Sequence, residues 1–132
     1  FSANPVACAA GTVLLEALRT EHLPARAAEL GAHLEHALRT VDVPGVRVEP
    51  IGRGLMLGAR IAAAPGDDRA GFTRSVVRRM RELGVIALRG GNDGSVVKWT
   101  PPLTITTAEL DHSVEILTAA LLATASSAED LR

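Results

Sequence analysis

Aromatic side chains are nearly absent from this sequence, which has two phenylalanines, one tryptophan and no tyrosine among 132 residues. We therefore expect a core built mainly from aliphatic side chains. Apolar residues make up 47% of the chain and charged residues 22%, which is typical of a globular domain rather than a disordered segment. The length suits one domain and is too short for two ordinary ones.

Cysteine, net charge and long apolar runs are also scarce. The single cysteine, Cys8, excludes an intrachain disulfide and fits a reducing compartment. Fourteen basic and fifteen acidic side chains give a formal charge of -1, so no strong field favours nucleic acid or an anionic membrane. No apolar run approaches the ~20 residues that span a bilayer, and no signal-peptide pattern is visible. These absences predict a cytoplasmic protein without nucleic-acid or membrane partners.

Motifs that carry a complete chemistry are missing too. The glycine-rich segments 52–54 and 90–92 match no nucleotide-binding fingerprint, and we interpret their glycines as turn residues with positive φ. His33 and His36 have no third ligand nearby in the sequence, so we interpret them as a solvated helix face and expect no metal site. Cys8 has no neighbouring histidine and is interpreted as a small core residue rather than a nucleophile.

The hydrophobic pattern predicts helices at about 5–20, 24–41, 72–83 and 106–124, and strands at about 46–50, 55–62, 85–88 and 95–99. Asn4-Pro5 starts the first helix, Gly84 stops the third, and Thr106 with Glu109 forms a capping box. Tight turns join the strands of each pair, so both pairs should be antiparallel with helices on one face. We predict an α+β two-layer sandwich whose other sheet face is free to meet another surface.

Two cations are prominent by position. Lys98 is the only lysine of the chain and lies in an apolar strand just before Pro101-Pro102, and Arg89 closes the preceding strand. A cation in an apolar strand needs an anionic partner. Two interpretations are open: a salt bridge at the sheet edge, or a group that positions a substrate carboxylate. Arginine would bind a carboxylate through two hydrogen bonds, and lysine as a point charge.

Four segments in order carry a family resemblance: FSANPVACAA (1–10), GRGLMLG (52–58), RELGVI (81–86) and VVKWTPPLTIT (96–106). They resemble the C-terminal small domain of class-III, pyridoxal-phosphate-dependent aminotransferases, and the match covers nearly the whole chain. The resemblance implies the small domain of a fold type I enzyme at 23–124. It also implies that a helix at 1–22 links to a large domain. The small and polar residues after Thr124 predict a frayed tail at 125–132.

The resemblance further implies a chemistry and partners. A large domain would hold pyridoxal phosphate on a lysine, and the usual reaction of these homodimers transfers an amino group to pyruvate or 2-oxoglutarate. The segment resembling Phe1-Ser2 approaches the cofactor phosphate of the partner subunit, so both residues are candidate cofactor-binding residues. Lys98 matches a position where many relatives carry a carboxylate-binding arginine, and a lysine there is similar to diaminobutyrate aminotransferases. Arg89 lies near a mobile carboxylate-binding arginine of some amine transaminases.

The same resemblance limits what the chain can do alone. The family's cofactor lysine, the acidic partner of the pyridine nitrogen and the stacking aromatic would all precede Phe1. We therefore assign no catalytic residue and expect the chain by itself to be inactive. Two alternatives stay open. The chain is either a non-catalytic interaction module of a split gene, docking through its uncovered sheet face and first helix, or part of a related enzyme such as an amino-acid racemase or a decarboxylating enzyme.

Overall fold

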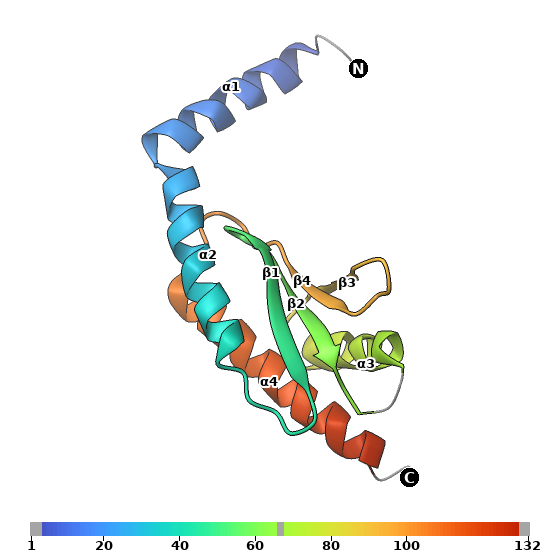
Figure 1. The fold of residues 1–132 in the computed structure, drawn as a ribbon. Coiled ribbons are helices and arrows are strands. Elements are labelled where there is room, and N and C mark those ends of the chain that lie inside the picture. The colour runs from blue at the N-terminus through green and yellow to red at the C-terminus, as the bar shows by residue number, and fades with distance from the viewer. Residues whose placement is uncertain (1–3, 66–67, 130–132) are drawn as a thin grey trace.

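The computed structural model describes residues 4–65 and 68–129. Helices and strands follow one another in the order α1 (Pro5–Thr20), α2 (Leu23–Arg39), β1 (Arg47–Arg53), β2 (Met56–Ala63), α3 (Arg69–Glu82), β3 (Leu88–Gly90), β4 (Val96–Trp99) and α4 (Thr107–Glu129). Figure 1 shows the strands in one sheet, with α2, α3 and α4 packed against it and α1 projecting away. The predicted α+β class is confirmed.

The sheet has the strand order β1-β2-β4-β3, and every neighbouring pair is antiparallel. The predicted hairpins β1-β2 and β3-β4 are both present, and the pairing of β2 with β4 joins them. Opposite residues share a face of the sheet, so the register Leu57 to Trp99 and Ala59 to Val97 places these four side chains on one side.

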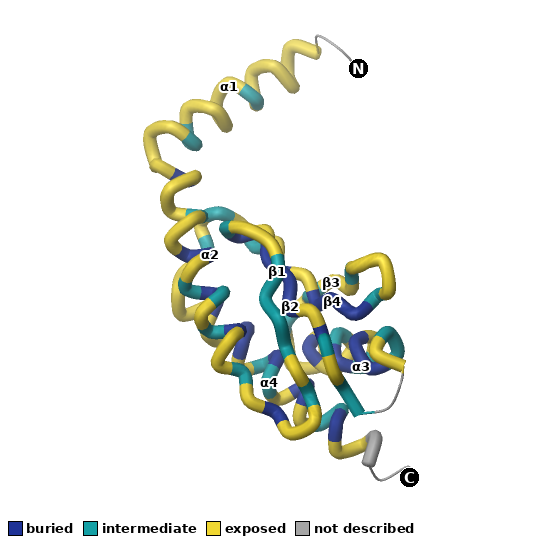
Figure 2. Tube along the Cα trace, viewed as in Figure 1, coloured by how far each residue is buried: buried dark blue, intermediate teal, exposed yellow. Residues whose placement is uncertain are grey.

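The core is aliphatic, as the composition predicts, and lies between this sheet face and the helices (Figure 2). Leu57, Ala59 and Ile61 alternate inward along β2, which is the period-two pattern expected from the sequence. Helix α4 contributes Leu110 and Leu117 to the same core, and both are fully buried.

Local sequence signals set most helix ends. The Asn4 side chain accepts hydrogen bonds from the backbone N–H groups of Val6 and Ala7, at 2.9 and 3.3 Å, and caps α1. At the end of α3, Gly84 has φ +97°. There the N–H groups of Gly84 and Val85 donate to the carbonyls of Arg81 and Met80, which is a Schellman motif.

Four element bounds differ from the prediction by three residues or more. Strand β1 ends at Arg53 rather than at 50, and α3 begins at Arg69 rather than at 72. Helix α4 continues past Thr124 to Glu129, because Ala125 packs into the core at 7% exposure and keeps the last turns on the sandwich. Residues 130–132 of the expected tail lie outside the described residues. Strand β3 begins at Leu88 rather than at 85, because the Val85 N–H is already used by the α3 cap and Val85 and Ala87 pack against the core.

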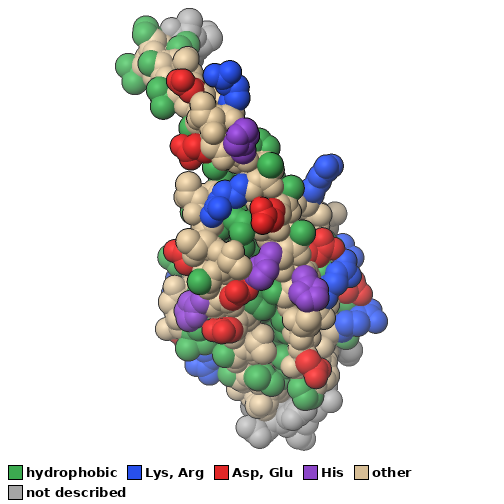
Figure 3. All heavy atoms as spheres, turned by 90° about the vertical axis from the view of Figure 1, so that its left-hand side faces the viewer, with side chains coloured by type: hydrophobic (Ala, Val, Ile, Leu, Met, Phe, Trp, Pro, Cys, Tyr) green, Lys and Arg blue, Asp and Glu red, His purple; other side chains and the backbone are tan. Residues whose placement is uncertain are grey.

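Helix α1 contributes no buried residue, and its Val6, Val13, Leu14 and Leu15 are 58–78% exposed. The predicted core position of Cys8 is wrong, because Cys8 is exposed on this helix. Figure 3 shows hydrophobic side chains gathered on this projecting end. The exposed surface of the chain is 8450 Å², whereas a compact monomer of this length would expose about 6,600 Å². In the described part of the chain, no helix has both the length and the apolarity needed to cross a membrane.

Candidate functional site

The face of the sheet that the helices leave uncovered is the first candidate surface, and we call it the open face. Strand alternation and register place the following side chains on it: Glu49, Ile51 and Arg53 of β1, Met56, Gly58 and Arg60 of β2, Leu88 and Gly90 of β3, and Val96 and Lys98 of β4. Met56 is 76% exposed and Leu88 61%, so this face carries apolar side chains in contact with solvent. An uncovered apolar sheet face is a usual place for a ligand or another protein surface to bind.

Lys98 projects from the middle of the open face, between Gly58 of β2 and Leu88 of β3. Its aliphatic stem passes over Gly90, since a Cβ on Gly90 would lie 2.3 Å from Lys98 Cδ. Lys98 is exposed, and among the described residues no carboxylate forms an ion pair with it. Of the two interpretations of Lys98, the salt bridge is therefore not found in the described residues, and the ammonium is accessible to an anion from outside the chain.

Two hollows border Lys98. The larger has a volume of about 660 Å³ and lies between the segment 84–88, the segment 98–102 and the start of α4. The smaller has a volume of about 250 Å³ and is lined mainly by Ile51, Met56, Gly58 and Val96 of the open face. Both are mostly apolar, and the larger falls in the size range of small-molecule sites. Sequence reasoning missed both hollows, because their walls combine segments that no local pattern connects.

Trp99 forms part of the wall of both hollows while its side chain stays buried at 6% exposure. Its indole Nε1–H donates to Ser113 Oγ at 2.9 Å, and the Ser113 hydroxyl donates to the Leu110 carbonyl at 2.7 Å. This chain of hydrogen bonds joins the end of β4 to α4 and satisfies the polar end of a buried aromatic residue. It holds the strand that carries Lys98 against the core.

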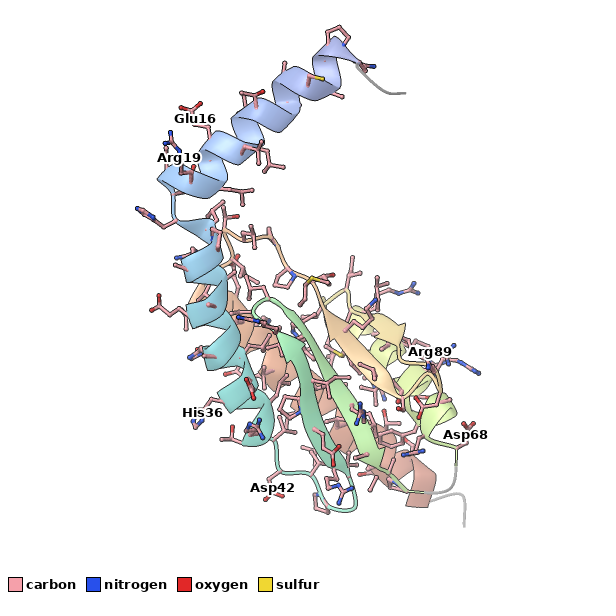
Figure 4. The ribbon with its side chains drawn as sticks, turned by 45° about the horizontal axis from the view of Figure 1, so that its top comes forward. Glu16, Arg19, His36, Asp42, Asp68 and Arg89 are labelled. Atoms are coloured by element: carbon pink, nitrogen blue, oxygen red, sulfur yellow. The ribbon has the colours of Figure 1, made fainter. Side chains whose placement is uncertain are left out.

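Arg89 does not lie with Lys98. Its register partner is Val97, so it projects from the opposite side of the sheet, and its Nη1 donates to the Ala70 carbonyl in α3 at 3.5 Å. In Figure 4, Arg89 lies at the end of the sheet beside α3, near Asp68. The two cations that the sequence singled out therefore face different surroundings.

Asp93 stabilises the glycine-rich turn that joins β3 to β4. The hydroxyl and the backbone N–H of Ser95 donate to Asp93 Oδ1, at 2.7 and 3.1 Å, and Arg69 lies 3.7 Å from Oδ2. The side-chain hydrogen bond from Ser95, then its backbone hydrogen bond, lower the pKa of the Asp93 carboxyl below its ordinary value. The turn thus fixes the β3-β4 register, and with it the neighbours of Lys98.

The histidine pair on α2 does not form a metal site in the described residues. His33 Nε2 lies 2.6 Å from Asp111 Oδ1 of α4, and His36 is exposed (Figure 4). Among the residues described, no group of three His, Cys, Asp or Glu side chains is placed to hold a metal ion.

Comparison with known proteins identifies the family. The family model of class-III aminotransferases matches residues 1–121. The chain belongs to the class-III aminotransferases. Ornithine aminotransferase 2 of Staphylococcus aureus is 32% identical over 115 residues, which is 87% of this chain and 26% of that protein. The chain thus spans about a quarter of the length of this curated relative.

Solved structures of similar proteins have the same fold. The ornithine aminotransferase of Toxoplasma gondii has a TM-score of 0.77 and 30% identity, over 96% of this chain and 29% of that chain. A phospholyase from Arthrobacter has a TM-score of 0.77 and 31% identity, over 89% of this chain and 29% of that chain. Class-III aminotransferases depend on pyridoxal phosphate.

The residues described here do not by themselves form a site for pyridoxal phosphate. Lys98, the only lysine, stands on an open sheet surface without a carboxylate partner in the described part of the chain. Phe72 and Trp99, which could stack on a ring, are buried among the helices. The predicted cofactor-binding residues Phe1 and Ser2 lie outside the described residues.

Proposed function

We propose that this chain is the C-terminal small domain of a class-III enzyme that transfers an amino group from an amine or amino acid to 2-oxoglutarate or pyruvate. The observation that carries the proposal is family membership together with an open sheet face that presents one accessible ammonium beside apolar hollows. Similar proteins are named ornithine, lysine and acetylornithine aminotransferases, which favours a diamino acid as donor. Pyridoxal phosphate, when bound by the parent protein, would supply the electron sink for the transfer.

The proposed organisation follows the burial pattern. Residues 1–22 would link to a large domain, because α1 buries none of its own side chains against the sandwich. Residues 23–124 would form the small domain, and 125–132 its tail, although α4 carries the first part of that tail as helix. We propose that the parent protein is a cytoplasmic homodimer, in which the large domain meets the open face.

Lys98 is proposed to bind the substrate carboxylate. An ammonium on an apolar surface attracts a carboxylate as a point charge, and the attraction strengthens when a second surface excludes water. Arg89 would do the same only after its side chain swings around the sheet edge, so we rank it below Lys98. The proposal that Phe1 and Ser2 contact the cofactor phosphate rests on the resemblance of their segment alone.

The first test is activity of the purified chain. Supplied with pyridoxal phosphate, ornithine, lysine or 2,4-diaminobutyrate, and either keto acid, the chain should show no transamination, because it lacks a second lysine to carry the cofactor. Turnover that survives Lys98→Ala would contradict the proposed inactivity.

The second test supplies a large domain from a relative. The Staphylococcus aureus relative without its matching segment, expressed together with this chain, should regain transamination. Lys98→Ala should then raise the KM for the amino donor by about tenfold or more, the loss expected for a charged hydrogen bond. Arg53→Ala is the matched control, since Arg53 lies on the same face but borders neither hollow. An equal effect of both substitutions would argue against a specific role for Lys98.

A second candidate function is a non-catalytic interaction module. The projecting α1 and the uncovered sheet face favour it, because both expose apolar side chains. Co-purification that yields only a homogeneous monomer, even with the large domain supplied, would count against this candidate. The further alternative is a related reaction on the same scaffold, such as that of an amino-acid racemase or a decarboxylating enzyme. One similar protein is named a phospholyase, so proteins with this fold do not all carry the name aminotransferase, and the donor assay distinguishes that case.

A further inference from the structure

On the open face, Val96 of β4 packs against Gly58 of β2 and against Gly91, and Lys98 of β4 packs over Gly90 of β3. A Cβ on Gly58 of β2 would come within 2.6 Å of Val96 Cγ1. A Cβ on Gly90 of β3 would come within 2.3 Å of Lys98 Cδ and 2.9 Å of its Cγ. Because only glycine lacks a Cβ, these two positions allow the neighbouring side chains to lie flat on the backbone.

The direction of the Lys98 side chain leaves the smaller hollow open beside the ammonium. With its stem over Gly90, the lysine occupies the β3 side of the face and borders the smaller hollow without covering it. The walls of that hollow are Ile51, Met56 and Val96, all apolar, and Lys98 is the charged side chain among its lining residues. The hollow of about 250 Å³ has room for a short aliphatic chain next to one ammonium.

We propose that Gly90 is the positioning residue of this site: it holds the Lys98 stem on the β3 side, and thereby sets the ligand as a carboxylate attached to a short apolar chain. The carboxylate meets the Lys98 ammonium, and the chain lies in the hollow. The ligand part of this inference rests on the carboxylate-binding role of Lys98 proposed above, whereas the positioning part rests on the geometry of Gly90 and Lys98 alone.

Gly90→Ala tests the positioning without unfolding the protein. Gly90 is absent from the glycines with positive φ, so alanine fits its backbone conformation. The atoms that the new Cβ would meet are Cγ, Cδ and Cε of Lys98, an exposed and flexible side chain, and no backbone atom is among them. The substitution should therefore push Lys98 toward β2 and over the hollow.

The single lysine makes the measurement specific. Reductive methylation with ¹³C-formaldehyde labels Lys98 and the terminal amine only, and keeps the ammonium charge. In the native chain, NMR should show contacts between Lys98 methylenes and the Gly90 α protons. In Gly90→Ala, contacts to the Met56 methyl group should replace them. Gly11→Ala is the matched control, because a Cβ there meets nothing within 4 Å, and it should leave the Lys98 contacts unchanged.

A titration tests the ligand. The Lys98 methyl signal should shift saturably with butyrate, and butyrate should bind more tightly than acetate because only butyrate reaches into the hollow. Gly90→Ala should weaken butyrate binding by about threefold, the scale of an exposed ionic contact.

The outcomes separate the two proposals. If the native chain lacks the Lys98–Gly90 contacts, or Gly90→Ala keeps the Lys98 environment unchanged, the positioning role is refuted. If the contacts are present but neither carboxylate produces a saturable shift, the binding role of Lys98 in the proposed function is refuted, and the ligand part of this inference with it.

Discussion

At Gly31, helix α2 touches the backbone of the β1-β2 hairpin directly. A Cβ at this position would come within 2.4 Å of the Cα, C and O atoms of Gly54, whose own φ is +55°. Backbone atoms in a tight turn do not move aside as a flexible side chain does. The approach of α2 to the hairpin therefore depends on one missing methyl group.

We expect Gly31→Ala to lower the free energy of unfolding by about 1–3 kcal/mol, the usual cost of forcing an extra carbon into a packed interface. The helix propensity that alanine adds offsets at most about 1 kcal/mol of this cost. Urea unfolding followed by circular dichroism measures the change. Gly11→Ala, in an open position of α1, should not destabilise the chain, and equal unfolding midpoints for both variants would contradict the proposed contact.

Among the elements, α4 begins at a complete capping box. The backbone N–H and the hydroxyl of Thr106 donate to Glu109 Oε2 at 2.8 and 2.7 Å, and the Glu109 N–H donates back to Thr106 Oγ1 at 3.2 Å. The hydrogen bond from the Thr106 backbone, followed by the one from its hydroxyl, lowers the pKa of Glu109 below its ordinary value of 4.5. Protonation of Glu109 therefore weakens the start of the helix.

This lowered pKa predicts a pH dependence of stability. A carboxyl whose pKa is lower in the folded than in the unfolded state contributes stability above its unfolded pKa, and the contribution is lost as the pH falls through the folded value. Glu109→Ala removes the contribution. The free energy of unfolding of the variant should then fall less steeply than that of the native chain from about pH 5 to pH 3.

Urea unfolding at several pH values measures this difference. Asp93 also has a lowered pKa, but it remains in both proteins and cancels in the comparison. Glu16→Ala is the control, because Glu16 forms no ion pair within the described ranges. A pH profile of Glu109→Ala parallel to the native one would rule out the capping contribution.

At the scale of the whole molecule, α1 is the described helix that buries none of its side chains. A helix of 16 residues that buries no side chain is marginal by itself in water. Val13, Leu14 and Leu15 are all exposed, and because they are consecutive they point to different sides of the helix. An apolar surface that packs against α1 from almost any side would therefore bury apolar side chains, which is favourable in water. The isolated chain should therefore associate with itself as its concentration rises.

Sedimentation velocity over a range of concentrations tests this expectation. Leu14→Glu with Leu15→Glu should weaken association by about tenfold or more, since each buried leucine contributes roughly 1.5–3 kcal/mol. Ile86→Glu is the matched control, because among the residues that the structure describes Ile86 is the most exposed large apolar residue outside α1, at 83%. Association that persists in the double variant and disappears with Ile86→Glu would assign the contact to the edge of the sheet.

Features that depend on interactions between residues close in the sequence could be predicted from the sequence. The Asn4 cap, the Gly84 stop and the Thr106–Glu109 capping box each act over one helical turn, and the inward alternation of β2 is a property of strand geometry. The order of four short segments likewise sufficed to predict the class-III family, which the family model confirms. The aliphatic core followed from composition.

Contacts between residues that are distant in the sequence follow only from the tertiary structure. Ala125 extends α4 because the core continues beneath it, and Val85 and Ala87 leave the strand because the helices take up their side chains. The β3-β4 register decides that Leu88, and not Arg89, lies opposite Lys98, and so separates the two cations onto opposite faces. A register depends on turn length and pairing across the sheet, which no local pattern encodes, and a shift of one residue would exchange the two faces.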